Sequence, residues 1–171
     1  MENGFITKCL KIYIAKNLRS NMFSIKKYSR QYNNCLLQFL EKCLPQSGRS
    51  LELTGRHKIY CNIDEVFEYF WCLFDEKEMI GTVALKKIND EHCELKSLYL
   101  FEQYHKKGFG YQLLKTAILK AQQDGYKEMY LDTLSSSTKA ISLYEKMGFT
   151  RIERYNTNYA ADIFMVLKLD N

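Results

Sequence analysis

A change of hydrophobic periodicity at Gly108 is the feature of the sequence that most constrains the fold. Before it, residues 93–100 have strand character, and after it apolar residues recur at helical spacing as far as Gly125. A second strand-like run follows at 128–134. Because parallel strands need a crossover connection, these segments predict a β-α-β unit in which helix 110–124 joins two parallel strands.

Three strand-like runs in the middle of the chain are separated by short polar links. The runs are Tyr69–Phe74, Met79–Lys87 and Cys93–Leu100, and the links are 75–78 and 89–91. Such short links predict an antiparallel meander. The first run is apolar on both faces, so we expect helices on both sides of the sheet.

The preceding segment predicts a strand at Met22–Tyr28 and then a helix, with Ser29 as its capping residue and Pro45 and Gly48 at its end. A short helix is expected near Asp64. The apolar stripe of the longer helix comprises Tyr32, Cys35, Leu36, Phe39, Leu40 and Cys43.

The C-terminal part predicts one helix and two strands. Residues Ser135–Ser137 are expected to cap the helix, which runs through Met147 and ends at Gly148. The strands are expected near Phe149–Glu153 and Ile163–Leu169. The whole pattern predicts an α/β (α+β) fold, with a mixed, mostly antiparallel central sheet of about seven strands and helices on both faces.

The length of 171 residues fits one domain, which we assign to residues 22–171. Residues 1–21 lack clear turn signals and are treated as an N-terminal extension of unassigned structure. The apolar piece Leu10–Ala15 is interrupted by Lys11 and is too short for a signal core or a membrane span. We therefore expect a soluble, cytoplasmic protein with no membrane partner.

The composition narrows the classes of partner. The net charge of +5 favours an anionic ligand, but the Lys and Arg residues are scattered, which argues against nucleic acid. Six cysteines form no C-x-x-C pair, and several lie in apolar runs, so we expect reduced thiols and no metal site. His57 and His92 have no partner pattern.

The most informative segment runs from Leu98 to Tyr111, where a strand leads through a loop into a helix. The first N–H groups of a helix have no partner within the helix, and the helix dipole favours negative charge there. Gly108 and Gly110 remove side chains where a backbone would approach phosphate. A tight turn alone would also explain the two glycines.

Two motifs resemble those of the GCN5-related N-acetyltransferase (GNAT) superfamily. The acetyl-CoA loop of that family reads Gln or Arg, two residues, Gly, one residue, then Gly or Ala; here it stands as His105-Lys106-Lys107-Gly108-Phe109-Gly110, with His105 departing from the pattern. The segment from Ala140 to Phe149 is similar to A-x-x-L-Y-E-K-x-G-F of the family's late helix. The resemblance covers about residues 22–170 in element order, but specific motifs lie only in 93–149.

The resemblance implies that acetyl-CoA binds between strands 93–100 and 128–134. The backbone of Leu98 and Leu100 would bind pantetheine, and Ser137 stands where the family often has a polar residue. Tyr144 would protonate the departing thiolate, although its helical spacing also fits a core aromatic. The pyrophosphate would lie on the loop formed by His105, Lys106, Lys107, Gly108, Phe109, Gly110 and Tyr111.

An alkyl ammonium must lose a proton before it can attack a thioester, so a base is needed. Glu94 lies on the strand where family members often place that base, but an exposed strand carboxylate is the usual fate of Glu. Glu91 and a water relay remain alternatives. A backbone amide of the central strand would polarise the thioester carbonyl.

The sequence thus predicts an N-acetyltransferase that passes the acetyl group of acetyl-CoA to a primary amine by direct attack. The alternative is a non-catalytic acyl-CoA-binding sensor or regulatory module. The acceptor, a small molecule or a peptide amine, stays open among antibiotic, polyamine, amino acid and peptide N-terminus. The resemblance to the superfamily implies that the walls of the acceptor site come from residues 29–66 and 153–162. The protein is expected to be a monomer or homodimer.

Overall fold

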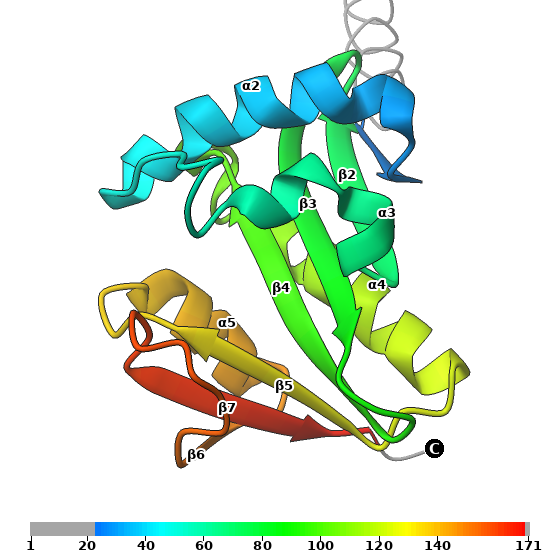
Figure 1. Cartoon of the computed structure of the whole chain (residues 1–171), viewed down its shortest axis with the longest axis vertical. Helices are drawn as coiled ribbons and strands as arrows, with labels where there is room; N and C mark the ends of the chain where they lie inside the picture. The colour runs from blue at the N-terminus through cyan, green and yellow to red at the C-terminus, as the bar shows by residue number, and fades with distance from the viewer. Residues whose placement is uncertain (1–22, 170–171) are drawn as a thin grey trace, which may run out of the picture.

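A seven-stranded sheet in the order β1-β2-β3-β4-β5-β7-β6 organises the computed structural model, which describes residues 23–169 (Figure 1). The predicted N-terminal extension, residues 1–21, lies outside this range, as do Met22, Asp170 and Asn171. The strands are β1 (Phe23–Lys27), β2 (Tyr69–Asp75), β3 (Glu78–Lys87), β4 (His92–Leu100), β5 (Glu128–Thr133), β6 (Thr150–Ile152) and β7 (Ile163–Lys168).

The α-helices include the three predicted from periodicity and the short one near Asp64, and short 3-10 turns lie between them. The α-helices are α2 (Asn33–Cys43), α3 (Ile63–Val66), α4 (Phe109–Gln123) and α5 (Thr138–Lys146). The 3-10 turns are η1 (Arg30–Tyr32), η2 (Leu44–Ser47), η3 (Lys58–Cys61) and η4 (Glu102–Tyr104).

The sheet is mixed and mostly antiparallel, as predicted. Strands β1 to β4 form an antiparallel meander, and β5 and β6 each pair antiparallel with β7. Strands β4 and β5 pair in parallel, with α4 as the crossover between them. The β-α-β unit predicted from the change of periodicity at Gly108 is therefore confirmed.

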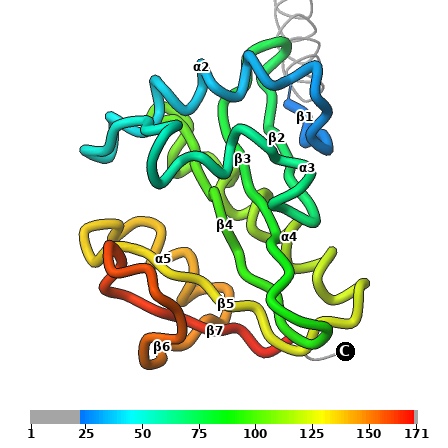
Figure 2. The backbone as a smooth tube through the Cα atoms, in the orientation of Figure 1, coloured from blue at the N-terminus to red at the C-terminus, as the bar shows by residue number. Residues whose placement is uncertain are grey.

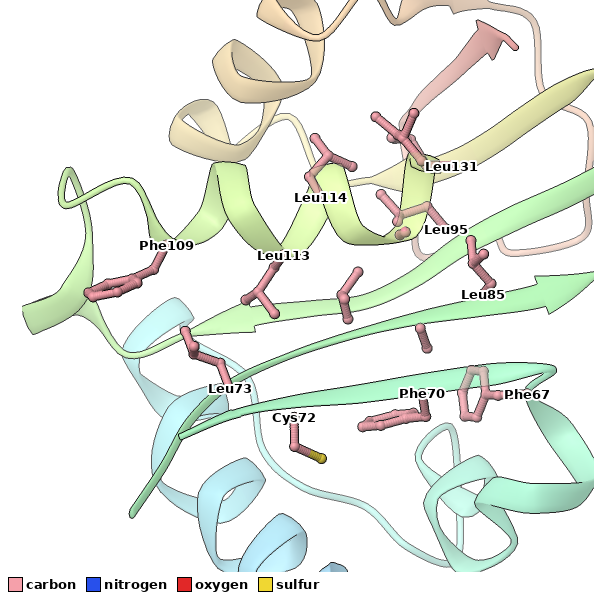
Figure 3. Packing of buried hydrophobic residues seen from close by; sticks show 14 of the residues in the cluster. Phe67, Phe70, Cys72, Leu73, Leu85, Leu95, Phe109, Leu113, Leu114 and Leu131 are labelled. Atoms are coloured by element: carbon pink, nitrogen blue, oxygen red, sulfur yellow. The ribbon is translucent and has the colours of Figure 1, made fainter. Parts of the chain in front are cut away.

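Helices cover both faces of the sheet. Helix α4 contacts β3 and β4 on one face, and α2 contacts β3 on the other. Figure 3 shows Leu113 of α4 pointing toward the strands from one side and Leu114 turned toward β5, while Phe70 and Cys72 of β2 point to the opposite side. All four side chains are buried. Burial of both faces explains why the β2 run is almost continuously apolar.

Two serines predicted as helix caps do not cap through their hydroxyls. Ser29 is extended and makes no side-chain capping bond; its carbonyl accepts the N–H of Tyr32 at 2.8 Å, and a 3-10 turn precedes α2. Ser137 precedes α5, also without a side-chain capping bond. At Ser29 a backbone carbonyl takes the place of the expected hydroxyl, because a 3-10 turn leads directly into the helix.

A β-bulge in β4 positions the functional site. The register of β4 against β3 shifts between Thr82 and Ala84, and Ser97 opposite this shift has a left-handed φ of 54°. An extra residue bends its strand and strengthens the local twist. Only His92–Glu94 of β4 pairs with β5. Beyond Glu94 the two strands separate, as Figures 1 and 2 show.

Candidate functional site

The separation leaves the second half of β4 with one edge that no described strand covers. The N–H of Phe101 donates to Ile80 of β3 at 3.1 Å. Because backbone groups alternate along a strand, the polar groups of Leu100 point away from β3, toward the side from which β5 has departed. An edge of this kind can pair with an extended ligand. This is the edge at which the resemblance places pantetheine, on the backbone of Leu98 and Leu100.

The carbonyl of Leu100 already has a partner within the chain. It lies 3.0 Å from Nε2 of His105, which must carry the proton to donate there. Nδ1 of the same ring is buried and has no partner in the described part of the chain. His105 therefore ties the end of β4 to the loop that leads into α4, and its ring faces the strand.

Six consecutive backbone N–H groups are free at the start of α4. Between residues 23 and 169, the N–H groups of residues 106–111 have no hydrogen-bond acceptor, and the ladder begins with Gln112 donating to Gly108 at 3.0 Å. Lys106 and Gly108 both have left-handed φ values, 60° and 86°. Successive N–H groups in such a turn form an anion-binding concavity, to which the helix dipole contributes. The region predicted to hold pyrophosphate has the donors that this requires.

The side chains of the loop have different environments. A Cβ at Gly108 would meet nothing within 4 Å, whereas one at Gly110 would lie 3.4 Å from Cδ2 of Leu143 on α5, so the missing side chain of Gly110 faces a helix. Phe109 is buried in the core, with its ring centroid 4.4 Å from that of Phe23. Phe109 and Gly110 can therefore serve an anion only through their backbone N–H groups.

The remaining predicted loop side chains lie at the surface. Nζ of Lys107 is 5.2 Å from the ring centroid of Tyr104. Tyr111 is exposed, and Nζ of Lys115 lies 5.9 Å from its ring centroid. Lys106 is exposed as well. Lys106 and Lys107 form no ion pair with a described carboxylate, so both remain available to attract phosphate by charge.

Glu94 lies at the last pair shared by β4 and β5, and its side chain is only 8% exposed. Three donors converge on its Oε1: Nζ of Lys96 at 2.9 Å, the hydroxyl of Tyr155 at 2.7 Å and Nδ2 of Asn156 at 3.2 Å. Oε2 has no hydrogen-bond partner among the residues that the structure describes. Glu94 is therefore not the solvent-exposed strand carboxylate that the sequence left as an alternative.

Glu91, the alternative base, lies at the opposite end of the β4–β5 pair. It precedes β4, its side chain is more than half exposed, and it forms an ion pair with Lys127. Its carbonyl accepts the N–H groups of Lys127 and Glu128, at the end where the two strands remain together. The opening between the strands begins on the other side of Glu94, so Glu91 has no access to it through this edge.

Asp132 of β5 completes a charged cluster at the point of separation. Its Oδ2 lies 3.0 Å from Nζ of Lys96, and it accepts Nδ2 of Asn156 at 2.6 Å and Nδ2 of Asn158 at 3.1 Å. Burial alone would raise the pKa of Asp132, but the charge and hydrogen bonds of Lys96 and of the two asparagines outweigh it, and the pKa lies below its ordinary value. Asp132 is therefore ionised at neutral pH.

Lys96 stabilises both carboxylates. Burial lowers the pKa of its ammonium, but the attraction of Glu94 and Asp132 outweighs burial and raises that pKa above its ordinary value. The group therefore stays charged. An ionised, buried carboxylate needs such a partner, and Glu94 in its ionised form is the form that can accept a proton.

Sequence reasoning did not assign Lys96, Tyr155 or Asn156 to the site. Lys96 was recognisable in principle, since residues two apart on a strand share a face. Tyr155 and Asn156 come from the loop between β6 and β7, 61 and 62 residues beyond Glu94, and no local pattern marks them. Their segment was predicted only as a wall for the acceptor.

Tyr144 of α5 belongs to the hydrophobic core through its ring, whose centroid lies 5.7 Å from that of Phe149. Its hydroxyl has no hydrogen-bond partner within residues 23–169. Burial raises the pKa of this hydroxyl above its ordinary value, and the charge of Arg49 opposes the rise. The hydroxyl therefore stays protonated at neutral pH and is available as a donor.

A hydrogen bond between Arg49 and Ser137 links the segment after α2 to the segment before α5. Nη2 of Arg49, which follows α2, donates to Oγ of Ser137 before α5 at 3.2 Å. Arg49 lies in the segment predicted as an acceptor wall, but no sequence pattern singled it out. Ser137, which the sequence associated with the cofactor, is thus already bound to a cationic side chain.

Neither a metal site nor a membrane span is found in the described part of the chain. No group of three or more His, Cys, Asp or Glu side chains there could hold a metal ion, and the described cysteines are free. None of the described helices has both the length and the hydropathy that crossing a bilayer requires.

Comparisons with known proteins agree with this arrangement. The model of the acetyltransferase (GNAT) family matches residues 35–149. The uncharacterized N-acetyltransferase YsnE of Bacillus subtilis is 33% identical over 105 residues, which are 58% of this chain and 69% of that protein. Human N-acetyltransferase 8B is 29% identical over 94 residues, 52% of this chain and only 41% of its own length.

Solved structures share the fold. An acetyltransferase of the GNAT family from Staphylococcus aureus superimposes with a TM-score of 0.79 at 20% identity, over 86% of this chain and 99% of that one. The PaiA N-acetyltransferase of Thermoplasma acidophilum, solved in complex with coenzyme A, has a TM-score of 0.67 at 22% identity, over 85% of this chain and 98% of that one. The family match covers the α2-to-Phe149 span that contains the open β4 edge and the α4 loop, and the chain therefore belongs to the acetyltransferase (GNAT) family.

Proposed function

We propose that this chain is an N-acetyltransferase that transfers the acetyl group of acetyl-CoA to a primary amine. The observation that carries the proposal is the row of free N–H groups at residues 106–111, next to the uncovered edge of β4. Phosphate needs such donors, and an extended pantetheine arm needs such an edge. Acetyl-CoA has both groups in one molecule.

In this proposal the cosubstrate lies along β4 with its pyrophosphate at the start of α4. The backbone of Leu98 and Leu100 binds pantetheine, and the N–H groups of the loop bind the phosphates. Lys106 and Lys107 add positive charge. The thioester then comes to the region framed by Glu94 and Tyr144, where β4 and β5 separate.

Glu94 acts as the base in the proposed reaction. Its Oε2 takes a proton from the acceptor ammonium, directly or through a water molecule, and the neutral nitrogen attacks the thioester carbon. The ion pair with Lys96 supports this role because it places a positive charge 2.9 Å from the carboxylate. A backbone N–H of β4 stabilises the negative charge that forms on the carbonyl oxygen.

Tyr144 acts as the acid in the same reaction. When the carbon–sulfur bond breaks, its hydroxyl donates to the departing thiolate, and solvent restores the proton. The protonated hydroxyl on a largely buried ring supports this assignment. A core aromatic with no chemical role would leave the same ring in place, so the hydroxyl alone is the group to test.

The test is an assay of CoA release with purified protein, acetyl-CoA and a panel of amines that includes aminoglycosides, polyamines, amino acids and peptides. Release that depends on one class of amine, with acetylated product detected by mass spectrometry, is the expected result. Binding of acetyl-CoA without release for any amine would contradict the enzyme and favour the acyl-CoA sensor.

A further inference from the structure

Arg49 is a partly buried cationic residue that the proposed reaction does not use. It follows the left-handed Gly48, and its backbone N–H donates to Leu44 at 3.1 Å. One guanidinium nitrogen donates to Ser137, but Nε is buried and has no acceptor among residues 23–169. Within the same range the guanidinium forms no ion pair with a carboxylate.

This arrangement is costly for the unliganded protein. A buried N–H without an acceptor loses its hydrogen bond to water and gains none in return. A guanidinium presents several donors in a planar fork, which matches the two oxygens of a carboxylate. An anion seated beside Nε would therefore supply the missing partner.

Ser137, the partner of Arg49, directly precedes α5, the helix that carries Tyr144. Burial is the main influence on the pKa of the Tyr144 hydroxyl, and the charges of Arg49 and Asp132 act on it in opposite directions. The hydroxyl therefore responds to both charges. In the proposed complex the pyrophosphate has its own donors at residues 106–111, in the loop and first turn of α4 rather than at Tyr144.

We propose that the acceptor amine carries a carboxylate, as an amino acid does, and that Arg49 binds this carboxylate while the amino group lies toward Glu94 and Asp132. The inference rests on the proposed acetyl transfer and names the chemical class of its acceptor. Ser137 holds the guanidinium in place before the acceptor arrives. Arg49 is thus a specificity-determining residue, and polyamines and aminoglycosides, which lack a carboxylate, are poor acceptors.

The experiment compares each of the common L-amino acids with its primary amide, for wild type and Arg49→Gln. The two compounds share the amine and the side chain, and the amide lacks the negative charge. The ratio of kcat/KM for acid and amide is measured in each protein, and the wild-type ratio is divided by the variant ratio, which cancels intrinsic amine reactivity. The expected quotient is about ten- to a hundredfold.

Two further variants define the control. Arg56→Gln removes the same charge from an exposed side chain, 54% accessible, on the same loop, and should give a quotient near one. Arg49→Lys keeps the charge without the fork and should fall between wild type and Arg49→Gln. Thermal unfolding of each variant checks that the fold is retained.

A parallel binding measurement does not depend on turnover. With the protein saturated with CoA, the shift in Tm is recorded for each amino acid and each amide, and only the acids should stabilise wild type, an effect lost in Arg49→Gln. A quotient of one together with equal Tm shifts would overturn the inference. The inference would also be overturned if Arg49→Gln bound acetyl-CoA more weakly while the quotient stayed at one. Arg49 would then bind an anionic group of the cosubstrate and not of the acceptor. Absence of CoA release with every amine would instead reject the proposed function.

Discussion

Nζ of Lys96 on β4 lies 3.0 Å from Oδ2 of Asp132 on β5, so an ion pair links the two strands just where their backbone pairing stops. Beyond the last backbone pair, Glu94 with Tyr130, this side-chain contact takes the place of backbone hydrogen bonds. It holds the two strands at the start of the opening while leaving the β4 edge beyond it uncovered. A cluster that binds the strands together thus also frames the proposed site for acetyl transfer.

Removal of the Asp132 charge should reduce stability in a pH-dependent way. The pKa of Asp132 is lowered in the folded chain from its ordinary 3.8, so its contribution is complete above that value and is lost as pH falls through the lower folded pKa. We expect urea unfolding at neutral pH to show Asp132→Asn less stable than wild type by roughly 1–3 kcal/mol, with the difference shrinking as the pH falls below 3.8.

Asp90→Asn is the matched control for that measurement. Asp90 also pairs with a lysine, Lys87, but its side chain is 94% exposed. Solvent screens such a pair, so its removal should leave the unfolding curve almost unchanged. An equal loss in both variants, or a loss in Asp132→Asn that persists in acid, would contradict the role assigned to the cluster.

Gly108→Glu should abolish the rise in Tm that acetyl-CoA produces. The substitution adds bulk and negative charge beside the free N–H groups of the loop, while a Cβ at Gly108 meets nothing within 4 Å. Gly125→Glu is the control, because Gly125 has a similar φ of 82° and equally open surroundings at the other end of α4. Both variants bear similar backbone strain, so a ligand shift retained in Gly108→Glu would remove the loop from the binding site.

Tyr144→Phe should keep the fold and lose turnover. The ring, which packs against Phe149, is preserved and only the hydroxyl is deleted. If the hydroxyl donates to sulfur, kcat should fall by about a hundredfold, with little change in the Kd for acetyl-CoA. Full activity, measured with any acceptor that wild type uses, would make Tyr144 a core residue alone.

Glu94→Gln should lower turnover most at neutral pH. With no carboxylate to take the proton, the rate should recover partly at high pH, where more of the acceptor amine is already neutral. Glu91→Gln removes the same charge at the paired end of the strands and should leave the pH profile of wild type intact. If the profiles of wild type and Glu94→Gln superimpose, the base is a water relay or another group.

The order of elements was predictable from periodicity because helices and strands impose repeats that a single segment displays. The glycine loop before α4 and the parallel pairing of β4 with β5 followed from local spacing and a general rule of connection. Ser29 shows the limit at helix starts: its hydroxyl is a suitable cap, but a 3-10 turn supplies a backbone acceptor instead.

The site was less predictable, because most of its contacts join distant segments. Glu94 could be placed on the right strand, but its burial depends on Tyr155 and Asn156, and Asn156 also binds Asp132. The bond between Arg49 and Ser137 spans 88 residues. Such partners meet only after the chain folds, and neither helical nor strand periodicity carries information about them.

The surplus residue near Ser97 makes the bulge in β4 a property of chain length rather than of side-chain chemistry. Strand β4 has one residue more than β3 can match, so exchanging side chains along its edge leaves the mismatch in place, whereas deleting one residue would even the count. The side chains that line this part of β4 can therefore be exchanged without removing the bulge.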